Sequence, residues 1–168
     1  MKLSRAFTVI ELIFVIVVLG ILSAIALPKF ANTGTQARVT SGKADVSAIR
    51  SAIMSERQKG IIKGQSSFIG VGTGTDGDGN KELDNGGLFG GVLTYAKQDS
   101  TGVGQWHKTG STGTTSTYTF NVDGATTVSF TYYEVATTVG ATTYNAGTFT
   151  CNPAAAGDAG KYCKQMIY

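Results

Sequence analysis

The sequence opens with a long apolar run, and this run limits the possible folds more than any other feature. The 21 residues from Phe7 to Leu27 contain a single charged residue, Glu11. As a helix rising about 1.5 Å per residue, the run is long enough to cross the roughly 30 Å hydrocarbon core of a bilayer. The six residues ahead of it carry Lys2 and Arg5. Because positive charge is retained in the cytoplasm, we expect the rest of the chain to lie outside it.

A secretory signal peptide is the alternative interpretation of such a run. A signal has an apolar core of about 7–15 residues followed by a small-x-small cleavage site. The present run is longer, although Ala24-Ile25-Ala26 has the small-x-small pattern. Glu11 argues against a signal, because a carboxylate inside a membrane segment costs about 2–4 kcal/mol and a plain signal gains nothing from it. A charge in such a segment indicates a functional site that awaits a partner charge.

The residues around Glu11 resemble a known family motif. The segment Ala6-Phe7-Thr8-Val9-Ile10-Glu11-Leu12-Ile13 is similar to the N-terminal motif of type IV prepilins and type II secretion pseudopilins. In that motif a short basic leader and a small residue precede Phe-Thr-Leu-Ile-Glu and a long apolar helix. The resemblance covers about the first 30 residues, including Pro28, and beyond them it is one of architecture only. One departure is Ala6, because the family prefers Gly before the cleavage site.

This resemblance implies a structural subunit rather than an enzyme, with no catalytic residue, cofactor or metal. It implies that prepilin peptidase cleaves between Ala6 and Phe7 and that the new amine of Phe7 is N-methylated. It also implies that Glu11 pairs with a Phe7 amine, usually that of a neighbouring subunit, during polymerisation on an inner-membrane assembly platform. The expected location is a single-pass inner-membrane protein and, after assembly, an extracellular pilus or a periplasmic pseudopilus.

Two alternatives to a pilus subunit remain. The first is a pseudopilin of a type II secretion system: within the resembled family a C-terminal disulfide favours a pilin, whereas a calcium-binding acidic turn favours a major pseudopilin. The second is a permanently anchored binding domain that never polymerises. Glu11 argues against this second alternative, because only polymerisation supplies its partner.

The chain as a whole is expected to form an α+β fold, in which one long helix packs on an antiparallel sheet. We divide it into a leader (1–6), a transmembrane and polymerisation helix (7–28), an amphipathic second half of that helix (29–60) and a β-rich head with a C-terminal disulfide loop (61–168). Val46, Ile49 and Ile53 have helical spacing and predict one apolar stripe. Gly60 is the predicted stop. Pro28 and the weak helix formers at 33–35 predict a kink or a local loss of helicity.

The C-terminal half has the alternation of antiparallel strands. Apolar residues alternate with polar ones on both sides of Asp123-Gly124, which predicts a hairpin. The alternating residues are Tyr118, Phe120 and Val122 on one side and Val128, Phe130 and Tyr132 on the other. Further strands are predicted at Val92–Ala96, around Trp106 and at Thr148–Cys151, and residues 61–90 are predicted to be mostly loop.

A few residues outside the apolar run are candidates for specific chemistry. In an exported domain Cys151 and Cys163 predict a disulfide worth about 3 kcal/mol. The lone histidine, His107, is expected to be a surface residue, and no Cys/His spacing suggests zinc. The net charge of +3 is too small and too scattered to indicate nucleic-acid binding.

An acidic turn follows the predicted helix. Asp76, Asp78, Asn80, Glu82 and Asp84 offer oxygen ligands of the kind that calcium prefers. The EF-hand pattern fails, because Lys81 occupies the position of its glycine and no Glu closes the loop. A solvated acidic turn is the simpler interpretation.

Overall fold

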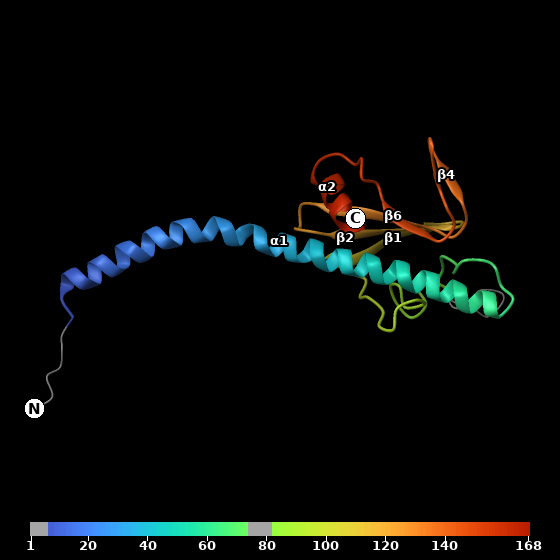
Figure 1. Ribbon diagram of the computed structural model, residues 1–168, viewed down its shortest axis with the longest axis horizontal. Coiled ribbons are helices and arrows are strands. Elements are labelled where there is room, and N and C mark those ends of the chain that lie inside the picture. The colour runs from blue at the N-terminus through green and yellow to red at the C-terminus, as the bar shows by residue number, and fades with distance from the viewer. Residues whose placement is uncertain (1–6, 74–81) are drawn as a thin grey trace, which may run out of the picture. The chain divides into compact units, whose positions relative to one another are not determined.

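The computed structural model describes residues 7–73 and 82–168, with the backbone alone for residues 27–32. The chain divides into two compact units, Met1–Ala37 and Arg38–Tyr168. The first consists, where it is described, of the beginning of helix α1 (Val9–Ile62). The second holds the rest of α1, two antiparallel sheets and helix α2 (Asp158–Ile167) (Figure 1).

The backbone of α1 is helical without interruption in the single chain, so the predicted loss of helicity around Pro28 and Gly34 does not occur there and stays a prediction for the assembled filament. A proline removes one hydrogen bond, and helical turns on both sides hold the backbone in place. The predicted stop at Gly60 is also too early. Gly64 (φ 84°) follows the last turn, and the amides of Gly64 and Gln65 donate to the carbonyls of Ile61 and Gly60. This is the Schellman arrangement, which needs a residue with positive φ and therefore favours glycine.

The main sheet has four antiparallel strands in the order β1-β2-β3-β6. A separate two-stranded sheet pairs β4 with β5. The strands are β1 (Trp106–Thr112), β2 (Thr115–Asn121), β3 (Thr127–Tyr133), β4 (Thr137–Val139), β5 (Thr142–Tyr144) and β6 (Thr148–Cys151).

The predicted stripe of α1 and the predicted hairpin are both confirmed. Val46, Ile49 and Ile53 are fully buried in the core of the second unit. The inward-facing side chains of β2 and β3 alternate with outward-facing ones as their polarity predicts. Between the helix and the sheet lies a cluster of aromatic rings with centroids 4.6–6.0 Å apart. Its members are Phe89, Trp106, Tyr118, Phe120, Phe130 and Phe149.

One predicted strand is wrong and two elements were not predicted. Val92–Ala96 is not a strand, because the preceding glycines turn the chain and leave only an isolated bridge between Leu88 and Lys97. The short hairpin β4–β5 lacks an apolar alternation, so its residues give no strand signal. Helix α2 carries Gly160 within it, yet it packs beside β6 and against α1, where Gly42 leaves room for Met166.

Candidate functional site

The candidate site lies at the start of α1, where Thr8 and Glu11 bind each other. The Thr8 hydroxyl accepts a hydrogen bond from the Glu11 amide (3.3 Å) and donates one to Glu11 Oε2 (2.8 Å). The Thr8 amide also donates to Glu11 Oε2 (3.0 Å). This is a capping box, in which two backbone N–H groups left open at a helix start are satisfied reciprocally. The box explains why the helix begins at Val9.

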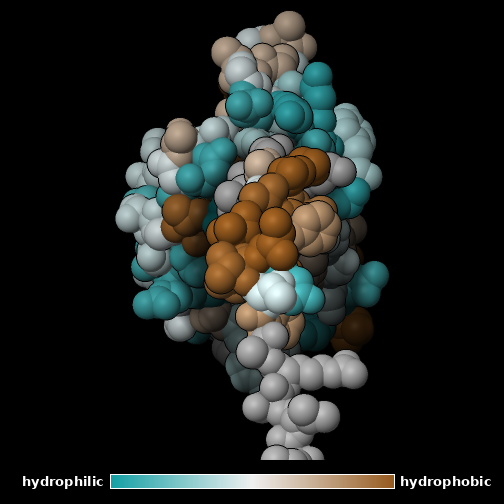
Figure 2. Space-filling view, turned by 90° about the vertical axis from the view of Figure 1, so that its left-hand side faces the viewer, coloured by the Kyte–Doolittle hydropathy of each residue, from teal (hydrophilic) through white to brown (hydrophobic). Residues whose placement is uncertain are grey.

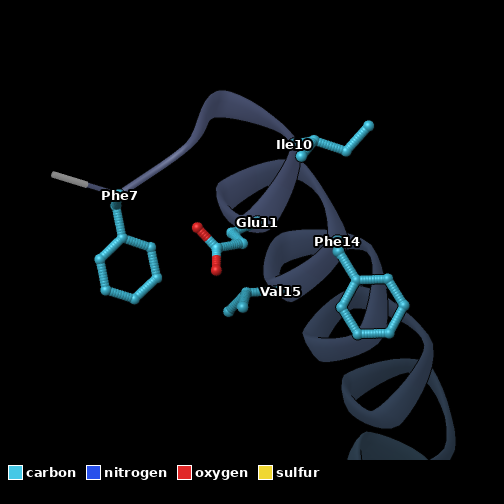
Figure 3. Close-up of a pocket in the computed structure, with 5 residues that line it drawn as sticks. All are labelled: Phe7, Ile10, Glu11, Phe14 and Val15. Carbon is cyan, nitrogen blue, oxygen red and sulfur yellow. The ribbon is translucent and has the colours of Figure 1, made fainter. Parts of the chain in front are cut away.

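The Glu11 carboxylate faces an open depression at the same end of the helix. The lining residues are Phe7, Ile10, Glu11, Phe14 and Val15. Figure 3 shows the carboxylate between the Phe7 ring and Val15, whereas the Phe14 ring points to the other side of the helix. An open depression of this kind, apolar except for one carboxylate, suits a cation that carries an apolar group.

The helix around this site exposes apolar side chains in every direction. Val9–Ala26 has a mean hydropathy of 2.9 and is long enough to cross a membrane, and none of it is buried within the molecule. Figure 2, viewed from the side on which α1 begins, shows the hydrophobic surface in brown. Exposure of such a large apolar area to water is unfavourable, so this segment needs lipid or protein around it.

Of the other residues of the expected assembly site, the structure describes Phe7 but not Ala6. Ala6, on one side of the expected cleavage site, lies outside the described residues, and so does the rest of the leader (1–6). Phe7 precedes the helix and is 81% exposed. No cationic side chain pairs with Glu11 within the part of the chain that the structure covers.

Cys151 and Cys163 form a disulfide, with their Cα atoms 5.9 Å apart. It ties the last strand, β6, to helix α2. Arg50 of α1 supports the same region, because its Nε donates to the Phe149 carbonyl (2.9 Å) and its Nη1 to the Ile167 carbonyl (3.3 Å). Burial lowers the pKa of Arg50 from its usual value. The C-terminal loop is thus fixed both covalently and by a charged hydrogen-bond donor.

The acidic turn does not form a calcium site within the described residues. Asp76, Asp78 and Asn80 lie outside them. Asp84 is neither solvated nor open to a metal: its side chain is 2% exposed, and its Oδ2 accepts from Lys108 Nζ (2.7 Å) and the Tyr118 hydroxyl (2.8 Å). Its Oδ1 accepts from the Phe89 amide (2.9 Å). In residues 7–73 and 82–168 no cluster of three metal-ligating side chains occurs.

This internal use of Asp84 was missed because the sequence places it beside other acidic residues. The structural role of Asp84 depends on two partners that are distant in the sequence, Lys108 on β1 and Tyr118 on β2, and only the fold brings these three residues together. Burial, and next the Asp84 carboxylate, raise the pKa of Tyr118 far above its usual value. His107 is half-exposed and its Nδ1 lies 2.7 Å from Asp99 Oδ1, in keeping with a surface residue.

The chain is similar to several proteins of known name, each over part of its length. A fimbrial protein of Pseudomonas aeruginosa is 40% identical over 52 residues, 31% of this chain and 34% of that protein. The type IV narrow pilus major component PilA5 of Thermus thermophilus is 45% identical over 60 residues, 34% of this chain and 52% of that protein. The type II secretion system core protein G of P. aeruginosa is 45% identical over 50 residues, 30% of this chain and 35% of that protein.

These similarities are confined to a part of each protein. The chain spans about a third to a half of the length of the curated relatives that it matches. No family model and no solved structure matches it. About a third of this chain is therefore similar to a fimbrial protein, a type IV pilus component and a type II secretion system core protein, as the motif around Glu11 predicts.

Proposed function

We propose that this protein is a structural subunit of a type IV pilus-like filament, not an enzyme. The observation that carries the proposal is a single carboxylate, Glu11, at the start of an exposed apolar helix. Lipid covers this helix before assembly and copies of the same helix cover it afterwards. A charge placed there is unfavourable unless assembly brings a cation to it.

Processing supplies that cation. Prepilin peptidase cuts between Ala6 and Phe7, and the peptide nitrogen of Phe7 becomes an amine that is then methylated. The mature chain is inserted in the inner membrane with its head outside the cytoplasm, and the assembly platform adds it to the filament. Intact-mass measurement of purified filaments tests this step: we expect a methylated chain that begins at Phe7. A chain that begins at Met1, or one cut after Ala26, contradicts it.

Substitution of Glu11 tests the assembly step. We expect Glu11→Gln and Glu11→Leu to leave a processed, membrane-resident pool with few or no filaments, because neither side chain carries the negative charge that forms an ion pair with a cationic amine. Glu56→Gln is the matched control, because Glu56 lies on the same helix but forms only an exposed ion pair with Lys59. Filaments are counted by electron microscopy and the membrane pool is measured by fractionation. Normal filament numbers from both Glu11 variants would leave an anchored, non-polymerising domain as the better interpretation.

A pilus is favoured over a secretion pseudopilus by two observations in the head. The C-terminal disulfide is present, and Asp84 of the acidic turn is used internally. In the resembled family the first feature is typical of pilins, and the second removes one ligand from a calcium site of the pseudopilin type. Immunogold labelling of intact cells distinguishes the two: we expect long labelled surface filaments. Label confined to the periplasm would favour the pseudopilus.

A further inference from the structure

Helix α1 ends in a surface that is both apolar and basic. Ile61 and Ile62 are 53% and 86% exposed, although both are large apolar residues. Lys59 and Lys63 lie on either side of them in the sequence. Lys59 pairs with Glu56 (2.6 Å), whereas Lys63 is exposed and forms no ion pair within the residues that the structure describes. We call Lys59, Ile61, Ile62 and Lys63 the basic end.

Two loops beside the main sheet form a second exposed surface, which is apolar and acidic. The loops are residues 99–105 and 121–127, and their only charged residues are Asp99 and Asp123. The side chain of Asp99 is 49% exposed, and Asp123 is exposed as well. Val103, in the first loop, is 44% exposed. We call these two loops the acidic end.

The basic end and the acidic end lie at opposite ends of the second unit. The Gly104 amide donates to the Asn121 carbonyl (2.6 Å), which joins the two loops. Arg38 Nη1 donates to the Val122 carbonyl (3.4 Å), which places the loops beside the first turn of α1 in this unit. Even with the charge of Arg38 counted, the loops keep a net negative charge. At about 1.5 Å per residue, the helix from Arg38 to Ile62 is about 36 Å long, and this length separates the two surfaces.

We propose that the basic end of one copy binds the acidic end of the next, so that the second units stack head to tail along the filament. This inference rests on the proposed function, and it adds a contact outside the apolar helix. The partner is a second copy because the two surfaces have opposite charge and each exposes apolar side chains. Burial of Ile62 and Val103 supplies attraction, and the lysines and aspartates supply orientation.

The placement of the two surfaces suits an open polymer. A contact between two different surfaces of one molecule leaves one surface free at each end, so further copies add without closing the assembly. A head-to-tail contact also keeps the α1 helices of successive copies parallel. Parallel helices are what a filament needs when every copy enters it from the same side of a membrane.

Cross-linking within filaments tests the contact directly. The two cysteines of the sequence are joined to each other, so newly introduced thiols are the reactive ones. Ile62→Cys and Ala125→Cys, both at exposed positions, are combined in the full-length protein, and intact filaments are treated with a short bifunctional thiol reagent. We expect a ladder of dimers and larger multimers from this double variant and none from either single variant. Filaments that form without the ladder overturn the inference.

A matched control for the cross-link combines Tyr95→Cys with Ala125→Cys. Tyr95 is 86% exposed, the same fraction as Ile62, but it lies outside both surfaces. We expect no ladder from this control. A ladder of equal strength from it would mean that exposed thiols react at random in the filament, and the inference would fail.

An exchange of charge tests the electrostatic part, whether or not the cysteine variants assemble. Lys63→Glu places a carboxylate opposite Asp123, and Ala125→Lys places an amine opposite Lys63, so each variant sets like charges against each other. We expect each to lower the number of filaments, relative to the processed membrane pool, about fivefold or more, and the double variant to recover at least about half of the original number. Lys161→Glu, at an exposed position of α2, is the control and should assemble normally.

The outcomes separate this inference from the proposed function. Normal filament numbers from both Lys63→Glu and Ala125→Lys, or no recovery in the double variant, overturn the head-to-tail contact. The proposed function then stands as long as Glu11→Gln still fails to assemble. Normal assembly of the Glu11→Gln and Glu11→Leu variants would instead remove the proposed function itself.

Discussion

Replacement of Lys108 by Met tests the idea that the buried Asp84 cluster holds the long connection between α1 and β1 on the sheet. The side chain of Asp84 is 2% exposed and that of Lys108 is 16% exposed. Their charged atoms lie 2.7 Å apart, and the Tyr118 hydroxyl binds the same carboxylate oxygen. Removal of Lys108 leaves a buried carboxylate without its countercharge.

The expected loss is large because Asp84 has no access to water. Removal of one partner of a buried ion pair costs about 3–5 kcal/mol of the free energy of unfolding. For a unit of this size, that corresponds to a melting temperature lower by about 10–20 °C. The assay is urea unfolding of the full chain in detergent, followed by tryptophan fluorescence. Trp106 is the single tryptophan and is buried in the aromatic core, so its emission reports unfolding of the second unit.

Two controls separate this cause from a general effect of losing a lysine. Lys59→Met removes an exposed ion pair with Glu56 and should cost less than about 1 kcal/mol. The double variant Lys108→Met with Asp84→Asn removes both charges, and the asparagine still accepts from the Phe89 amide, so it should recover at least about half of the loss. A loss below about 1 kcal/mol for Lys108→Met, or no recovery in the double variant, would refute the reasoning.

Three further predictions concern the same unit. Burial raises the pKa of Tyr118 above that of an unfolded tyrosine, which ionises near about pH 10, so the stabilisation from the neutral Tyr118 is complete below that pH and is lost as the pH rises above it. Tyr118→Phe should therefore flatten the fall in the free energy of unfolding that urea titration measures between about pH 9 and pH 11. Gly91→Ala should cost about 1–3 kcal/mol, because an added Cβ meets the backbone of residues 82–83, whereas Gly110→Ala, where the space is open, should cost little in the same urea assay. Reaction of the unfolded, unreduced protein with a thiol reagent should leave Cys151 and Cys163 unlabelled, and replacement of either by Ser should cost about 3 kcal/mol.

The parts of the fold that could be predicted from the sequence are those with a local period. The stripe of Val46, Ile49 and Ile53 has the helical period, and the strands on each side of Asp123-Gly124 have the strand period. The connection between α1 and β1 has neither. Its conformation depends on long-range polar contacts such as the Ser111 and Ser116 hydroxyls on the Val71 carbonyl, which no local pattern reveals.

The candidate site could be predicted in part for the same reason. Glu11 is conspicuous because it is the only charge in an apolar run. The capping box was missed, although Thr8-x-x-Glu11 has the spacing of one ahead of an apolar helix. A lone charge in an apolar run indicates an intermolecular partner, whereas the structure shows that Thr8 binds the same carboxylate within the chain.

The register of a filament built from such helices cannot come from the apolar residues. Burial of apolar area is favourable in many relative positions of two helices, because the hydrophobic effect has no direction. Glu11 is the only charge in the run, so we expect it to select one position among those that apolar burial allows. Exchange of neighbours, Glu11→Leu together with Leu12→Glu, tests this directly. It keeps composition and hydropathy unchanged but moves the carboxylate by about 1.5 Å along the helix and about 100° around it.

We expect the exchanged protein to insert in the membrane as well as the original, because its apolar content is the same. We expect it to form few or no filaments, because the displaced carboxylate loses the three-residue spacing of the capping box with Thr8 and no longer lies where a neighbouring amine arrives. Ile16→Leu is the matched control: Ile16 is exposed in the same run and the change alters shape without adding charge, so its filaments should be normal. Counts of filaments from both variants, at equal membrane levels, decide the matter. Normal filaments from the exchanged protein would mean that a carboxylate anywhere near the helix start suffices, and that the register is set by the heads.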